Sequence, residues 1–318
     1  FFLSLAMAIT DGLSNAGISM TPLGLAEMGE GPQLVFEHRF LPAVRERIGE
    51  RVLLLTIDEF EELGARVSRG RLPEEIFPYL RHLIQHGEQL AFIFAGTHQV
   101  EELIGDYWSV LFNIAKYKKV GFLNREDAVR LITDPVQPHG MVYDDLAIDE
   151  ILRLTAGHPY FTQLLCHILV NRCNQAHCSY VTVQDVRGAV EEFLETGRAH
   201  LTFIWNTSDR AARLSLAALA ELRDQVDRVT AAAISDRLGA HEIHLDPAQV
   251  VETMDLLARR DIARESPGEV AGRSMSYDFT AQLYARWVRR YKPLSKVVEE
   301  AGSEPATVMG EMTGEPTK

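Results

Sequence analysis

Hydrophobic positions divide the chain into a first part, where short apolar runs alternate with helices, and a second part made of helices. Residues 1–14 and 34–49 are predicted as helices, and 51–57 is a nearly continuous apolar run. Such a run suits a strand buried on both faces. Helical spacing returns over 73–87, and a second buried strand is expected at 90–95. Strands that alternate with helices predict an α/β layer with a parallel sheet.

The pattern changes after a third candidate strand at 118–123. The next helices, which would form an all-α lid continuous with the sheet, are expected at 125–133, 146–156, 160–174 and 183–193. Three more helices are followed by a hairpin, the layout of a winged helix-turn-helix; they are expected at 209–224, 230–238 and 247–260, with the hairpin over 262–279. The end of the chain lacks periodicity and is predicted to be disordered. The predicted domains are an α/β core over 1–123, the lid over 124–200, the winged helix over 201–292 and the tail over 293–318.

Composition limits the classes of function. The net charge of −13 argues against a protein that coats nucleic acid or an anionic membrane through bulk charge. Three cysteines make no disulfide framework and favour a reducing cytoplasm. No stretch approaches the ~20 apolar residues that span a bilayer, so no membrane partner is expected. The apolar opening segment lacks the basic flank and cleavage site of a signal peptide. It is predicted to be an amphipathic helix entered midway, inside a domain.

Two acidic residues follow the first predicted strand. In P-loop NTPases an acid at a strand's carboxyl end holds the magnesium that bridges the nucleotide phosphates, which makes Asp58 the candidate. Glu59 could then polarise the attacking water as a general base. Open α/β sheets bind ligands at this edge. The alternative is a plain strand followed by an acidic helix start, in which Glu61 and Glu62 favour the helix dipole.

Two further sites have both a functional and a purely structural interpretation. Thr97 follows the second strand and could orient water or contact a γ-phosphate, although it could equally cap the next helix. Gly157, His158 and Pro159 make a sharp corner between two predicted helices. The fixed backbone of such a corner could sit against a flat base, although a plain helix hairpin also uses Gly and Pro.

Taken in order over about residues 1–290, these motifs resemble the STAND class of AAA+-related ATPases. The resemblance implies an incomplete P-loop NTPase-type parallel sheet, a helical lid and a winged helix. It also implies that Asp58 and Glu59 are the Walker B pair, with magnesium on Asp58 and water activation by Glu59. Thr97 corresponds to the sensor of the γ-phosphate. Gly157, His158 and Pro159 correspond to the lid turn that contacts adenine.

The sequence departs from this family in one essential motif. The family holds the phosphates in a loop of the pattern G-x-x-x-x-G-K-[ST], and no such pattern occurs in the 318 residues. The loop is expected upstream, so the chain as given is expected to bind ATP poorly. The predicted function is an ATP-binding and ATP-hydrolysing switch module of a cytoplasmic signalling or regulatory protein. It would use ATP and magnesium, contact a protein partner or its own effector domain, and assemble in a nucleotide-dependent way.

The alternative function is a winged-helix DNA-binding regulator with a degenerate ATPase domain. Against it, the expected recognition helix carries Asp246, Glu252 and Asp255, and residues 201–292 contain as many Lys and Arg as Asp and Glu. A DNA reader is usually distinctly basic. A protein-contact role is therefore preferred for this part. Zinc is disfavoured because Cys166, Cys173 and Cys178 match no closed ligand set.

The stretch Arg286-Trp-Val-Arg-Arg290 is a basic cluster in this part of the chain. Its arginines could touch a phosphate. The preferred interpretation is that Trp287 and Val288 pack inward while the arginines extend along the surface.

Overall fold

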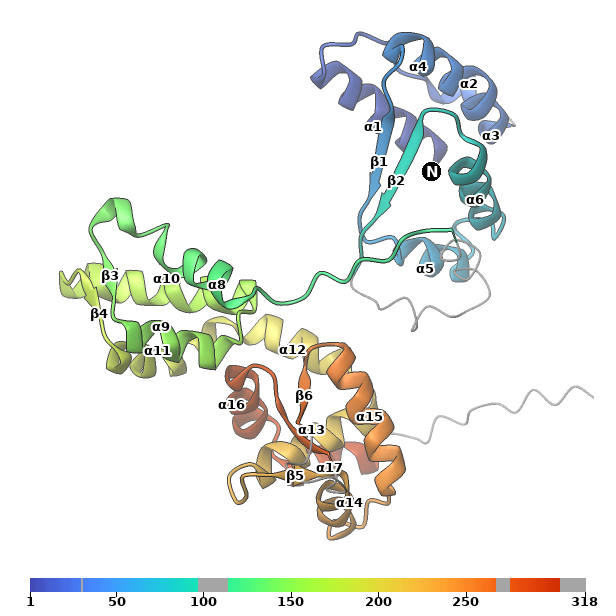
Figure 1. Cartoon of the computed structure of the whole chain (residues 1–318). Coiled ribbons are helices and arrows are strands. Elements are labelled where there is room, and N and C mark those ends of the chain that lie inside the picture. Colours follow the sequence, from blue (N-terminus) through green and yellow to red (C-terminus); the bar gives the residue numbers. More distant parts are fainter. Residues whose placement is uncertain (30, 97–113, 267–274, 304–318) are drawn as a thin grey trace, which may run out of the picture. The chain divides into compact units, whose positions relative to one another are not determined.

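The computed structural model describes residues 1–29, 31–96, 114–266 and 275–303. The chain divides into two compact units, residues 1–119 and residues 120–318 (Figure 1). The structure is mixed α/β and mostly helical, as predicted for the fold class, with a small parallel sheet in the first unit.

The sheet of the first unit consists of β1 (Leu53–Ile57) and β2 (Leu90–Phe94). The strands pair in parallel from Leu53↔Leu90 to Ile57↔Phe94, which confirms the predicted parallel sheet. The prediction that both faces are buried is wrong, because Leu54 and Ile93 are 53% and 51% exposed. Leu55, on the opposite face of β1, is buried against the helices of this unit. A continuous apolar run therefore has only one covered face here.

Helices surround the covered face of this sheet. Leu55 belongs to a hydrophobic core that also contains residues of the opening helix, of the helical stretch before β1 and of α6 (Ile76–His86). A second cluster packs Phe60 and α5 (Glu62–Ser68) against another face of α6, through Phe60, Leu63, Phe77 and Leu80. The helical elements of the unit are α1 (Phe2–Asn15), α2 (Leu25–Met28), α3 (Pro32–Val35), the π-helical turn η1 (Phe36–Phe40), α4 (Leu41–Ile48), α5 (Glu62–Ser68) and α6 (Ile76–His86).

The candidate strand at 118–123 is not a strand in the structure. Val120 is 91% exposed, and Gly121 interrupts the apolar run. At the end of this segment the Leu123 N–H donates to the Gly157 carbonyl at 3.0 Å. An apolar composition without a neighbouring strand to pair with does not produce a ladder.

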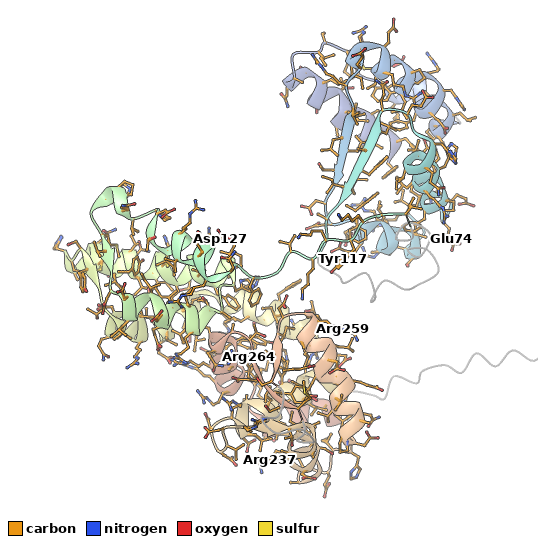
Figure 2. The ribbon with its side chains drawn as sticks, in the orientation of Figure 1. Glu74, Tyr117, Asp127, Arg237, Arg259 and Arg264 are labelled. Atoms are coloured by element: carbon orange, nitrogen blue, oxygen red, sulfur yellow. A yellow bond between two sulfur atoms is a disulfide. The ribbon has the colours of Figure 1, made fainter. Side chains whose placement is uncertain are left out.

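The second unit opens with the predicted helices of the lid. They are α8 (Arg125–Thr133), α9 (Asp145–Thr155), α10 (Pro159–Ala176) and α11 (Val183–Thr196), with α12 (Arg198–Asn206) in addition. Asp127, labelled in Figure 2, donates its N–H to the Asn124 side chain at the start of α8. The short turn η3 (Gln137–His139) and the parallel pair β3 (Val142–Tyr143) and β4 (Tyr180–Val181) complete this region.

Three helices and a small antiparallel sheet follow the lid. The helices α13 (Arg210–Leu222), α14 (Ala231–Gly239) and α15 (Pro247–Arg259) lie within two residues of their predicted bounds. The sheet has the order β5-β7-β6, with antiparallel pairing throughout. Its strands are β5 (Val229–Thr230), β6 (Ala263–Ser266) and β7 (Ser276–Phe279), and α16 (Gln282–Tyr291) follows them.

The prediction of a disordered tail from 293 is wrong for its first part. Residues Leu294–Ser303 form the helix α17. Leu294, Val297 and Ala301 are buried in the same hydrophobic core as α13. Their spacing of three and four residues places them on one face of the helix. The remaining residues of the predicted tail, 304–318, lie outside the described residues.

Two of the three cysteines are bonded to each other, contrary to the expectation from their number. Cys173 and Cys178 form a disulfide, while Cys166 is free and half-buried. The helix α10 ends at Ala176, and His177 adopts a left-handed backbone with φ of 53°. That turn reverses the chain, so the Cys178 N–H donates to the Cys173 carbonyl at 2.9 Å. Sequence separation alone does not reveal this reversal.

Candidate functional site

The first half of the predicted site lies at the carboxyl end of β1. Asp58 and Glu59 follow the strand directly, and both are exposed. The Glu59 N–H donates to Oδ1 of Asp58 at 2.9 Å, which fixes the orientation of that carboxylate. Glu59 has a φ of 49°, in the left-handed region that non-glycine residues rarely adopt. Uncommon backbone conformations of this kind gather at functional sites.

Backbone hydrogen bonds hold the turn after β1 against the end of β2. The Phe60 N–H donates to the Ala95 carbonyl at 3.1 Å, and the Ala95 N–H donates to Ile57 at 2.9 Å. A Cβ added at Gly96 would lie 2.6 Å from the Phe60 ring, so a larger residue there would force the ring to move. Thr97, the predicted sensor residue, lies outside the described residues. The structure therefore places the acidic pair beside the end of the second strand.

The second half of the predicted site is the corner between α9 and α10, in the second unit. Ala156 and Gly157 both have a left-handed backbone, with φ of 54° and 75°. A Cβ on Gly157 would come within 2.5 Å of the Leu123 carbonyl oxygen. Pro159 is the first residue of α10, where its missing N–H loses no helical hydrogen bond. His158 caps the helix, since its Nδ1 accepts the Phe161 N–H at 3.4 Å.

Aromatic rings surround this corner. The His158 ring stacks on Phe161 with centroids 4.1 Å apart, and Phe122 lies 4.8 Å from it. Tyr160 contacts His200 at 4.4 Å and is 40% exposed. Sequence reasoning named His158 and missed the other rings. Tyr160 and Phe161 adjoin the motif and could have been noticed, whereas nothing in the sequence connects His200 to it.

Burial, followed by the nearby His200, lowers the pKa of His158 to about 4. The ring is therefore neutral at pH 7. Because Nδ1 accepts the Phe161 N–H, the ring proton of the neutral form resides on Nε2. A neutral imidazole of this kind offers one hydrogen-bond donor and a flat face, which suits contact with a heteroaromatic ring.

Replacing His158 with Asn is expected to make the second unit less sensitive to acid. Because the folded pKa lies below the unfolded one, the contribution of His158 to stability is present above pH 6.5 and is lost as the pH falls toward 4. The wild-type chain should lose about 2–3 kcal/mol more than His158→Asn between pH 7 and pH 4, since one pKa unit corresponds to about 1.4 kcal/mol. Asn still caps the helix.

Urea unfolding at the two pH values measures this difference. The matched control is His139→Asn, which removes an exposed histidine of the same unit. It should keep the wild-type pH dependence. Equal pH dependence in His158→Asn and wild type would show that His158 is not the titrating group.

The chain is similar in structure to proteins of known fold. The Walker-type ATPase PABY2304 of Pyrococcus abyssi matches with a TM-score of 0.61 at 15% identity, over 90% of this chain and 77% of that chain. ORC1 of Aeropyrum pernix in complex with DNA has a TM-score of 0.39 at 14% identity, over 94% of this chain and 92% of that chain. RuvB of Thermotoga maritima has a TM-score of 0.38 at 16% identity, over 74% of this chain and 72% of that chain. The sequence matches no family model and no curated protein. The chain therefore shares the fold of this Walker-type ATPase.

The carboxylates after β1 fit a magnesium–nucleotide site in part. Magnesium in such sites binds one or two carboxylates and takes its other ligands from phosphates and water. Asp58 supplies an exposed carboxylate with one oxygen already oriented. Among the described residues, no three His, Cys, Asp or Glu side chains are grouped to hold a metal by themselves. The remaining ligands would have to come from the nucleotide and solvent.

None of the helices in the described part of the chain is both long and apolar enough to cross a membrane.

Proposed function

We propose that the chain is the ATP-responsive module of a magnesium-dependent ATPase switch of the STAND type. The observation that carries the proposal is the acidic pair held at the carboxyl end of β1. Asp58 would hold magnesium, and Glu59 would activate the attacking water. Thr97 is the proposed sensor of the γ-phosphate.

The corner at Gly157–Pro159 is proposed to contact the adenine. Its backbone is constrained by two consecutive left-handed residues, and it presents the neutral His158 ring among other aromatic rings. Flat rings at a rigid corner favour stacking on a flat base. The phosphates need a cradle of backbone N–H groups and a lysine, which we propose is supplied by sequence outside these 318 residues.

The elements α13 to β7 are proposed to form a winged helix. Three helices with an antiparallel sheet of order β5-β7-β6 support this assignment. We propose that nucleotide exchange biases the lid and the winged helix between two arrangements, and that a protein partner or effector domain responds. The proposed domains keep the predicted boundaries except that α17 joins the winged helix.

DNA binding by the winged helix is the second candidate, favoured by the order of its elements. The charges of its third helix, α15, argue against DNA binding. Asp246 caps that helix, and Asp255 shares a hydrogen bond with Glu265 that raises the pKa of Glu265. Arg260 binds Thr207 through two hydrogen bonds of 3.1 and 2.8 Å. This face thus offers carboxylates to a phosphate backbone, and one of its arginines is already engaged, which favours a protein contact.

Amide hydrogen exchange tests the proposed adenine contact. The chain, extended upstream by the sequence proposed to hold the phosphate-binding loop, is compared with and without Mg–ATP. Protection should rise at residues 155–162 and at residues 58–62. Bound nucleotide without added protection at 155–162 would contradict the role given to the corner. DNA binding that falls steeply with salt and ignores nucleotide would favour the second candidate.

A further inference from the structure

A small cavity lies between the lid and the part that follows it in the second unit. Its volume is about 170 Å³, and α9, the end of α13, β7 and α16 line it. The liquid volume of one water is about 30 Å³, so the space holds a tetrahedral oxyanion and several waters. The charged residues that line it are Arg153, Arg223, Arg286, Arg289, Asp224 and Asp278.

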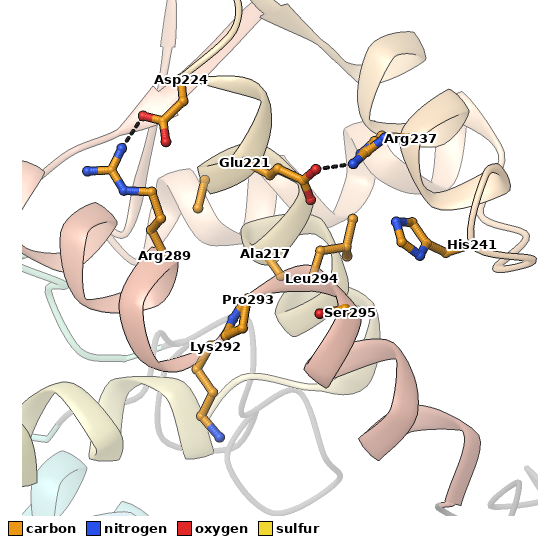
Figure 3. A pocket seen from close by; sticks show the side chains of 11 residues that line it. Ala217, Glu221, Asp224, Arg237, His241, Arg289, Lys292, Pro293, Leu294 and Ser295 are labelled. Carbon is orange, nitrogen blue, oxygen red and sulfur yellow. Dashed lines mark hydrogen bonds and ion pairs between the residues drawn. The ribbon is translucent and has the colours of Figure 1, made fainter.

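Both acidic residues of the cavity already have arginine partners. Asp278 forms ion pairs with Arg223 at 3.2 Å and with Arg264 at 2.8 Å. Arg264, labelled in Figure 2, belongs to β6. Asp224 forms an ion pair with Arg289, which Figure 3 shows beside a neighbouring, larger cavity that shares these two residues. The carboxylates are therefore engaged, and the arginines of the cavity outnumber them.

Arg153 approaches the cavity from the lid. Its Nε and Nη2 bind the buried Glu150 at 2.7 and 2.8 Å, and Arg187 binds the same carboxylate at 3.4 Å. This bidentate pair holds the Arg153 guanidinium in one orientation and leaves its Nη1 for another acceptor.

The surroundings of the Arg286 guanidinium favour the binding of an anion. Within the described residues, its guanidinium forms no hydrogen bond or ion pair. Burial, followed by the charge of Arg153, lowers its pKa; Glu150 acts in the opposite direction, and Arg289 and Arg187 add to the lowering. A half-buried cation beside other cations is unfavourable unless an anion compensates it.

We propose that this arginine cavity binds a phosphate-type oxyanion, with Arg286 as the principal ligand and Arg153 and Arg289 beside it. A guanidinium offers five N–H donors in a plane, which match two oxygens of a phosphate at once. The anion would join α9 of the lid to α16 and stabilise their packing. The anion site includes neither the acidic pair Asp58 and Glu59 nor the corner at 157–159. A test of this site is therefore independent of the proposed ATPase function.

Thermal unfolding of the 318-residue chain in inorganic phosphate, against chloride at equal ionic strength, tests the site. Phosphate should raise the Tm of the wild type and leave that of Arg286→Gln unchanged. The matched control is Arg290→Gln, which removes an exposed arginine of the same helix, paired with Glu191. It should respond to phosphate as the wild type does. Without phosphate, Arg286→Gln should be at least as stable as the wild type, since it removes a cation without a partner.

Calorimetric titration gives the second measurement and identifies the source of the phosphate group. Arg286→Gln should weaken binding at least tenfold. If inorganic phosphate and pyrophosphate bind and a short DNA duplex does not, the ligand is a small phosphate compound. If the duplex binds and Arg286→Gln lowers its salt slope by about 1, the source is a nucleic-acid backbone. No binding of any of the three, or equal binding by wild type and Arg286→Gln, would overturn the proposal.

Discussion

Replacing Glu59 with Gln is expected to lower ATP turnover at least about 100-fold and to leave Mg–ATP binding within about twofold of the wild type. The amide keeps the size and shape of the side chain and cannot accept the proton of the attacking water. The left-handed backbone of Glu59 and its hydrogen bond to Asp58 should also persist, because the backbone N–H makes that bond. Binding and chemistry would thus be separated by one substitution.

The measurement is steady-state phosphate release beside equilibrium binding of a fluorescent ATP analogue, on the chain extended upstream by the sequence proposed to hold the phosphate-binding loop. Glu62→Gln is the matched control, since it removes a neighbouring exposed carboxylate at the start of α5. The control should turn over at the wild-type rate. If Glu59→Gln retained full turnover, the general-base role of Glu59 would be refuted.

Replacing Gly157 with Ala is expected to lower the free energy of unfolding of the second unit by about 2–4 kcal/mol. A side chain at a φ of 75° costs about 1–2 kcal/mol by itself. The added Cβ would also lie 2.5 Å from the Leu123 carbonyl oxygen, so the backbone must move apart. That movement would break the hydrogen bond from the Leu123 N–H to the Gly157 carbonyl.

Gly140→Ala separates the two contributions. Gly140 has a φ of 71°, and no atom lies within 4 Å of the position its Cβ would take. Gly140→Ala should lower the free energy of unfolding only by the cost of the left-handed backbone, about 1–2 kcal/mol. Urea unfolding can be followed by fluorescence, because Trp205 and Trp287 are buried in this unit. Equal losses in the two variants would mean that the corner tolerates a side chain, contrary to the rigid corner described above.

Much of the fold follows from the spacing of hydrophobic residues. The helices of the second unit follow closely from the sequence because their apolar positions repeat at helical spacing. The structure adds capping residues at their starts, such as Thr182 and Asp185 for α11. Strand β1 and the acidic pair after it also follow from the sequence, because an apolar run ends there at two charged residues. These features depend on residues close together in sequence.

The features that the sequence does not reveal depend on contacts between segments far apart in the chain. An apolar run looks the same whether one face of a strand is covered or both are, so the exposure of Leu54 was missed. His200 meets His158 only because α12 follows α11 back toward the corner. The missing partner of Arg286 depends on which acids its neighbours have already engaged, which no spacing reveals.

Magnesium-dependent binding of ATP tests the central claim most directly. A fluorescent ATP analogue is titrated with and without magnesium into the 318-residue chain, into the chain extended upstream, and into the extended chain carrying Asp58→Asn. We predict that the extended chain binds the analogue, that Asp58→Asn removes the dependence on magnesium, and that the 318-residue chain binds at least about 100-fold more weakly, a difference of about 2.7 kcal/mol. Failure of the extended chain to bind ATP at all would mean that the likeness to P-loop ATPases is one of fold alone.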